Sequence, residues 1–151
     1  RFFFLKKGII VKIQERGKKK RIYQANGHSI YTQAPLVILV NKTSASASEI
    51  VAGSLKEHKR AIIVGETTFG KGTIQRLRAL KDGSALLFTA GYYQLPSGTS
   101  IQGTGIKPDR IIELSEEDRL LLLLSESSSH PEKDLQLHAA IDMALLELDK
   151  H

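Results

Sequence analysis

Two short segments of the sequence carry side chains that could work together as a nucleophile and a base. Residues 44–50 read SASASEI and follow the apolar run at residues 36–40 after three intervening residues. Residues 69–75 read FGKGTIQ and place Lys71 between two glycines. A serine at a strand-to-helix turn is well placed to attack a carbonyl carbon, and a desolvated lysine can lose its proton and act as the base. The pair suggests serine-lysine hydrolysis.

The serine segment also has a purely structural interpretation. Ser46 and Glu49 have the spacing of a capping box, in which the two residues satisfy each other's backbone N–H groups at a helix start. Three features favour catalysis: serines alternate with alanines, the turn follows a strand of the parallel type, and small neighbours leave room for a substrate backbone. Free N–H groups at a helix N-terminus can also hold an oxyanion. The local pattern leaves both interpretations open.

The lysine segment comes close to a phosphate-binding loop. Residues 65–72 (GETTFGKG) match the pattern GxxxxGK[ST] except at the last position, where glycine removes the hydroxyl that would bind magnesium. The residues after Lys71 also have the pattern of a strand rather than a helix. We therefore expect a base and not a nucleotide site. Phe69 and Ile74 would give Lys71 apolar cover, and Gln75 would orient its amine.

The spacing of apolar residues predicts the elements that hold these segments. Residues 36–40 and 61–64 are continuous apolar runs typical of strands buried on both faces of a parallel sheet, and residues 47–58 have helical spacing. Strand, helix and strand form a βαβ unit, which closes right-handed. Further strands are expected at residues 9–15, 20–24, 73–79, 84–95 and 111–112.

The two ends of the chain carry their own expectations. Residues 1–5 are apolar and could end a helix that Gly8 caps. Near the other end, residues 120–124 are expected to cover an edge of the core, and residues 125–131 to be flexible. Residues 134–149 predict an amphipathic helix. Its expected apolar face consists of Leu137, Ile141, Ala144, Leu145 and Leu148.

Composition narrows the classes of function. The chain has 151 residues, which fits one domain, and it has no cysteine, which excludes disulfides, thiolate zinc sites and a cysteine nucleophile. Its five histidines form no metal-ligand spacing, so we expect no metal and no cofactor. The longest apolar run is far short of the roughly 20 residues that span a bilayer. Arg1 in place of Met predicts a fragment or a processed product.

Much of the net charge of +6 lies in residues 16–21 (RGKKKR). One interpretation is an acidic partner, either nucleic acid or an anionic membrane surface. The other is a solvated hairpin turn between two strands, with Gly17 where a turn needs glycine. We favour the hairpin and expect no nucleic-acid partner.

Residues 41–75 resemble the catalytic core of the carboxy-terminal processing, or tail-specific, serine peptidases. The matching strings are residues 44–50 (SASASEI), 64–66 (VGE), 68–75 (TFGKGTIQ) and 103–109 (GTGIKPD). The resemblance implies an α/β fold, namely a crotonase- or ClpP-like ββα catalytic core fragment with a C-terminal amphipathic helix. It divides the chain into a partial peptidase core at 1–114 and a flexible segment with a helix at 115–151, with the family's PDZ domain and N-terminal region absent.

The resemblance also implies roles for individual residues. By position, Ser46 is the nucleophile, Lys71 is its base and Gln75 supports the lysine. Ser46 and Lys71 are 25 positions apart, which is the usual spacing in the family. The Ala47 backbone N–H is the expected oxyanion donor. Glu57 stands where relatives often have an acidic residue, and we expect it to be structural because it lies about three helical turns from the serine.

The activity implied is that of a serine endopeptidase that cleaves proteins near their C-termini, in processing or degradation. Its partners would be protein or peptide substrates recognised by their C-terminal tails, and its location extracytoplasmic: periplasm, cell envelope or lumen. Proximity to a membrane surface, homo-oligomer formation and activity of the fragment alone stay open. The alternative is a catalytically silent binding or scaffold domain of the same fold, in which Ser46 and Lys71 never meet.

Overall fold

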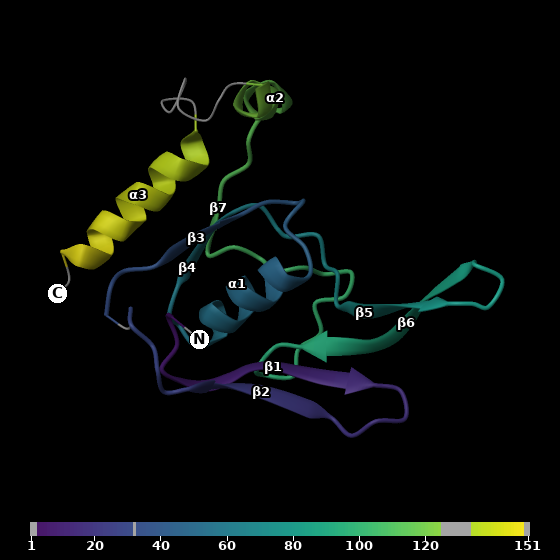
Figure 1. The fold of residues 1–151 in the computed structure, drawn as a ribbon. Coiled ribbons are helices and arrows are strands. Elements are labelled where there is room, and N and C mark those ends of the chain that lie inside the picture. The colour runs from purple at the N-terminus through teal and green to yellow at the C-terminus, as the bar shows by residue number, and fades with distance from the viewer. Residues whose placement is uncertain (1–2, 32, 125–133, 150–151) are drawn as a thin grey trace.

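The computed structural model describes residues 3–31, 33–124 and 134–149, which form two β-sheets and three helices (Figure 1). One sheet is antiparallel with strand order β2-β1-β6-β5, and the other is parallel with order β3-β4-β7. The elements in chain order are β1 Lys7–Glu15, β2 Arg21–Asn26, β3 Val37–Val40, α1 Ala47–Glu57, β4 Ile62–Gly65, β5 Thr73–Ala79, β6 Ala85–Gln94, β7 Arg110–Ile111, α2 Glu116–Leu124 and α3 Leu135–Leu148.

The predicted βαβ unit is present, with α1 as the connection between β3 and β4. These strands pair in parallel register from Val37 beside Ile62 to Val40 beside Gly65, and β7 adds to the far side of β4. Within the described residues β3 is therefore an edge strand. Full burial of β3 was the wrong expectation: Val40 is buried, but Leu39 is 41% exposed.

Helix α1 lies between the two sheets, and α3 covers the other face of the parallel sheet (Figure 1). Two hydrophobic clusters fill the layers around α1. The cluster toward the antiparallel sheet contains Val11, Tyr93, Leu95, Ile101 and Ile106. The cluster toward the parallel sheet contains Val40, Ala52, Leu55, Ala61 and Ile63. Helix α1 is thus packed on both sides.

The basic run at residues 16–21 forms the turn of the β1–β2 hairpin, with Gly17 at φ 70°. Glu15 precedes the turn and is only 3% exposed. Its carboxylate pairs with Lys18 and Arg21 of the hairpin and with Arg76 of β5. Part of the positive charge of the run is thus paired with a buried carboxylate, which supports the hairpin interpretation.

The N-terminal prediction was wrong, because Gly8 lies inside β1 and caps no helix. Its φ is 116°, and a Cβ atom on it would come 2.5 Å from the His58 ring. That ring hydrogen-bonds the Ile9 carbonyl through Nε2 at 2.7 Å. Gly8 lets the β1 backbone pack directly against the C-terminal end of α1.

The predicted C-terminal helix is present as α3, but its buried face is rotated from the expected one. Gln136 and Ala140 are buried, whereas most of the expected stripe is exposed, namely Leu137, Ile141, Leu145 and Leu148. The Gln136 amide donates to the Ile112 carbonyl at 2.8 Å, which fixes the helix by its polar side. None of the helices in the described residues has the length and apolar character to span a membrane.

Helix α2 contains the leucines at 120–124 that were expected to cover an edge of the core. Leu120 and Leu124 are exposed, whereas Leu121 and Leu122 are half-buried. Arg119 of the same helix binds Glu66 with two hydrogen bonds, at 3.2 and 2.8 Å, and so attaches α2 beyond the end of β4. The flexible segment predicted at residues 125–131 lies outside the described residues.

Candidate active site

Ser46 occupies the N-cap of α1, at the turn that follows β3. Its backbone has φ 56° and ψ −111°, a left-handed conformation that a residue with a Cβ atom rarely adopts. Such a conformation costs on the order of 1–3 kcal/mol, and residues of this kind cluster at functional sites. Ser46 is half-buried at the N-terminus of the helix.

The fold gives the three serines of the segment different environments. Ser44 is part of the turn itself: its Oγ accepts from the Asn41 N–H at 3.1 Å, and its carbonyl accepts from the Phe69 N–H at 3.0 Å. Ser48 is exposed on the first turn of α1. Ser46 therefore combines backbone strain with partial burial, as a nucleophile at a strand-to-helix turn would.

Glu49 joins the serine turn to the lysine turn. Its Oε2 accepts from the N–H groups of Ser46 and Lys71, both at 2.9 Å. Its Oε1 accepts from Thr68 Oγ1 at 2.5 Å and from the Gly70 N–H at 2.7 Å. The side chain is fully buried, at 0% exposure. Since one oxygen contacts both backbone nitrogens, Ser46 N and Lys71 N are at most twice 2.9 Å apart.

Lys71 is half-buried, and its Nζ forms no hydrogen bond or ion pair with another described residue. No hydrogen bond joins Nζ to Ser46 Oγ in the described residues, although the two backbones are held together. Catalytic hydrogen bonds often tighten only when substrate binds. Of the two residues expected to give Lys71 apolar cover, Phe69 is 65% exposed and Ile74 packs against the core cluster around Tyr93.

The lysine turn rests on the glycine-rich segment that precedes β7. The Gly103 N–H donates to the Gly70 carbonyl at 2.9 Å, and the Ile106 N–H donates to Thr68 Oγ1 at 2.7 Å. Gly105 has φ 67°, and a Cβ atom there would lie 2.2 Å from the Thr68 carbonyl oxygen. Only glycine permits this approach, so residues 103–109 support the turn that carries Lys71.

Two other predicted residues lie nearby without a contact that defines their role. Gln75 lies in β5 opposite Thr89, just after a β-bulge, and its side chain is exposed. Neither Lys71 nor any other described residue hydrogen-bonds its amide. The Ala47 N–H opens α1 and donates to no acceptor in the described part of the chain. It is therefore free to bind a carbonyl oxygen that approaches Ser46.

Comparison with known proteins identifies the family of this chain. The sequence profile of Peptidase family S41 matches residues 2–112. The chain belongs to peptidase family S41. This confirms the resemblance drawn from the strings at residues 44–50, 64–66, 68–75 and 103–109.

Relatives within peptidase family S41 include carboxyl-terminal-processing peptidase 2, chloroplastic, of Arabidopsis thaliana, with 48% identity over 71% of this chain and 21% of the relative. A carboxyl-terminal-processing protease of Synechocystis sp. has 40% identity over 93% of this chain and 31% of the relative. The solved structure of a photosystem II D1 C-terminal processing protease superposes with a TM-score of 0.69 and 44% identity, over 74% of this chain and 29% of that one. The chain thus spans between about a fifth and a third of these relatives.

The structure places two further residues at the candidate site of this S41 family member. The sequence analysis did not identify either of them as a site residue. Glu49 was visible only as a capping-box residue, and the spacing gave no sign of its bonds to residues 68–71. Thr68 had no signal beyond its place in a matching string. Glu57, in contrast, has the structural role predicted for it: its carboxylate accepts from the N–H and the hydroxyl of Ser97, at 2.7 and 2.6 Å.

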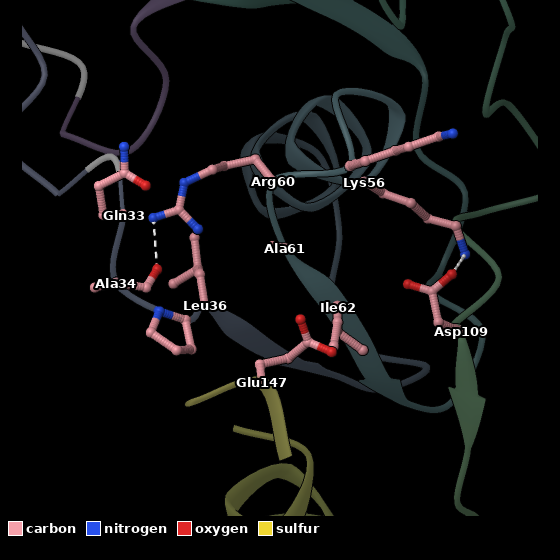
Figure 2. Close-up of a pocket in the computed structure, with 11 residues that line it drawn as sticks. Gln33, Ala34, Leu36, Lys56, Arg60, Ala61, Ile62, Asp109 and Glu147 are labelled. Carbon is pink, nitrogen blue, oxygen red and sulfur yellow. Dashed lines mark hydrogen bonds and ion pairs between the residues drawn. The ribbon is translucent and has the colours of Figure 1, made fainter. Parts of the chain in front are cut away.

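A separate pocket of about 400 Å³ lies at the opposite end of the parallel strands, beside Leu36 and Ile62 (Figure 2). Three of its charged side chains, those of Lys56, Arg60 and Asp109, make contacts within the fold. Arg60 donates to backbone carbonyls, including that of Ala34 at 2.8 Å, and Lys56 pairs with Asp109 at 2.8 Å. We therefore assign the candidate site to the serine and lysine turns and not to this pocket. The described residues also contain no cluster of acidic or histidine side chains that could hold a metal ion.

Proposed function

We propose that this chain carries the catalytic residues of a serine endopeptidase that cleaves proteins near their C-termini. The observation that carries the proposal is the shared Glu49 oxygen, which accepts from the backbone N–H groups of both Ser46 and Lys71. Two residues distant in sequence are thereby held at adjacent turns. Membership of peptidase family S41 and relatives named as processing proteases support the reaction class.

In the proposed acylation step, neutral Lys71 takes the proton from Ser46 Oγ, which attacks the carbonyl carbon of the substrate. The Ala47 N–H donates to the oxyanion that develops on the carbonyl oxygen. The protonated amine of Lys71 then gives its proton to the leaving nitrogen, and the peptide bond breaks. The role proposed for Gln75, support of the lysine amine in this step, rests on its position in the family's motif.

Deacylation reverses these roles with water as the nucleophile. Lys71 takes a proton from water, the water oxygen attacks the acyl carbon, and Ser46 Oγ leaves with the proton returned by the lysine. The same two side chains thus act in both halves of the cycle, and the reaction needs no cofactor.

The substrates that fit the proposal are protein or peptide chains cleaved close to their C-terminal tails. One matched structure is named for processing the C-terminus of the photosystem II protein D1, which supports this class of substrate for the present chain. We also propose an extracytoplasmic location, as for the tail-specific peptidases that the sequence resembles.

Cleavage of a tagged protein substrate by the full-length protein tests the proposal. Ser46→Ala and Lys71→Ala should each lower kcat by about 10⁴-fold or more, with folding intact by circular dichroism. Lys71→Arg should not restore activity, because arginine does not lose its proton. Retained turnover by Ser46→Ala would refute the assignment of the nucleophile.

The scaffold alternative predicts a different pattern in the same assay. The wild-type protein would bind the substrate without cleaving it, and Ser46→Ala would bind equally well. Cleavage that depends on both Ser46 and Lys71 would exclude that alternative.

A further inference from the structure

Tyr93 of β6 is a buried phenol whose hydroxyl has no hydrogen-bond partner in the described part of the chain. The residue is only 3% exposed. An unpaired buried hydroxyl costs free energy, because it has lost its bonds to water and gained none in return. A native structure that keeps such a group calls for an explanation.

The backbone fixes Tyr93 beside the lysine turn. Its N–H donates to the Gly72 carbonyl at 3.0 Å, and Gly72 directly follows Lys71. The ring belongs to the hydrophobic cluster between α1 and the antiparallel sheet, against which Ile50 and Ile74 also pack. Ile50 follows Glu49 in α1, so the cluster that contains the ring packs against the first turns of that helix as well as beside the lysine turn.

Ser46 and Glu49, both at the start of α1, act on the Tyr93 hydroxyl. Burial raises the pKa of Tyr93, an interaction with the Ser46 side chain partly offsets that rise, and the charge of Glu49 adds to it. No hydrogen bond of ordinary geometry is formed between the two hydroxyls. The raised pKa keeps the proton on the phenol, so Tyr93 has an O–H ready to donate.

We propose that Tyr93 is a third catalytic residue, whose O–H donates to Ser46 Oγ as that oxygen gives its proton to Lys71 and attacks the substrate carbonyl. The proposal rests on the proposed function. The Ser46 proton goes to Lys71 Nζ, the new bond joins Oγ to the carbonyl carbon, and Tyr93 keeps its own proton. Because negative charge develops on Oγ during this step, the hydrogen bond is stronger in the transition state than at rest.

Tyr93→Phe in the full-length protein tests the proposal, with Tyr92→Phe as the matched control. Tyr92 is the preceding residue of β6 and is 52% exposed. We expect Tyr93→Phe to lower kcat by about 10- to 100-fold with KM unchanged, which corresponds to loss of one hydrogen bond to a charged group. The thermal midpoint should stay the same or rise, because phenylalanine removes an unpaired buried hydroxyl. Tyr92→Phe should leave all three quantities unchanged.

Three results would overturn the inference: wild-type kcat in Tyr93→Phe, a change in KM alone, or a fall of kcat accompanied by a lower thermal midpoint. The last would mean that the hydroxyl serves only the fold. Ser46→Ala in the same assay separates this inference from the proposed function. If Ser46→Ala is inactive and Tyr93→Phe is fully active, only the role of Tyr93 is refuted; if Ser46→Ala retains turnover, both are.

Discussion

Glu15 and Glu49 are both buried carboxylates, but their partners differ in kind. Glu15 pairs with three cationic side chains, Lys18, Arg21 and Arg76, each about half exposed. Glu49 accepts hydrogen bonds from three backbone N–H groups and one threonine hydroxyl, and from no cation. The first arrangement joins the side chains of the antiparallel sheet, and the second fixes the backbone path of two turns.

The difference matters because flexible cations can find water or another acceptor, whereas a backbone N–H cannot move away from its turn. Loss of Glu15 leaves its partners solvated, but loss of Glu49 leaves buried donors unpaired. Substitutions at Glu49 should therefore disturb the geometry around Ser46 and Lys71, and substitutions at Glu15 should not.

The largest effect is expected for Glu49→Gln. In glutamine an NH₂ group, which is a hydrogen-bond donor, replaces one of the two accepting carboxylate oxygens. It would face the N–H or O–H donors of the two turns, and we expect the turns to move apart. We expect kcat in the full-length protein to fall by about 100-fold or more, and unfolding free energy by about 2–4 kcal/mol. Denaturant unfolding and peptide cleavage measure the two quantities.

Glu15→Gln is the control for that substitution. It should change kcat by less than about twofold, because Glu15 bonds to side chains of the antiparallel sheet and to neither Ser46 nor Lys71. If Glu15→Gln and Glu49→Gln lost equal activity, the difference drawn here between the two glutamates would be wrong, and activity would follow global stability.

Thr68→Val should have a smaller effect than Glu49→Gln. Thr68 Oγ1 donates to Glu49 and accepts from the Ile106 N–H, so valine leaves one buried donor unpaired and removes one donor from the carboxylate. We expect a loss of about 1–3 kcal/mol in unfolding free energy and a fall of about tenfold in kcat. Thr67→Val, at an exposed neighbouring position, should change neither, and a similar loss there would contradict the assigned role.

The strain at Ser46 gives a third prediction. Glycine tolerates φ 56° far better than alanine, so Ser46→Gly should be more stable than Ser46→Ala by about 1 kcal/mol, although both are inactive. Thermal unfolding of the two variants measures the difference. Equal midpoints would mean that the turn stores no strain at Ser46.

The smallest effect concerns acid stability. The hydrogen bond from Lys18, with the charge of Arg76, holds the pKa of Glu15 below its ordinary value of 4.5, and the bond from Arg119 lowers the pKa of Glu66 in the same way. A lowered pKa stabilises the fold above pH 4.5, and that contribution is lost as pH falls through the folded-state pKa.

Glu15→Gln and Glu66→Gln should therefore lower the thermal midpoint at pH 7 by about 2–4 °C and reduce its decline in acid. Midpoints measured between pH 7 and pH 3 test this. A decline as steep as in the wild type would assign the acid sensitivity to other carboxyl groups.

The sequence predicted those parts of the fold that depend on local periodicity. The apolar runs at 36–40 and 61–64 and the helical spacing between them marked the βαβ unit, and Gly17 marked the first hairpin. The face of α3 could not be predicted in this way, because Gln136 is fixed by the Ile112 carbonyl, 24 residues earlier in the chain. A hydrogen bond between residues so far apart in the sequence leaves no periodic pattern of apolar residues.

For the candidate site, too, local patterns in the sequence predicted some residues and could not predict others. Resemblance and spacing indicated Ser46 and Lys71, because their strings are short and continuous. The contacts of Glu49 with residues 68–71 bridge 19 to 22 positions, and Tyr93 reaches the site from another sheet. Contacts between elements depend on the packing of α1 between the two sheets, which no local pattern of residues specifies.

The most direct test of the central claim is to identify the acylated residue. The full-length protein would be reacted with a slowly hydrolysed peptide ester, quenched in acid, digested, and mapped by mass spectrometry. We predict an acyl adduct on Ser46, with acylation strongly slowed in Lys71→Ala. An adduct on Ser44 or Ser48, or adduct formation independent of Lys71, would contradict the account.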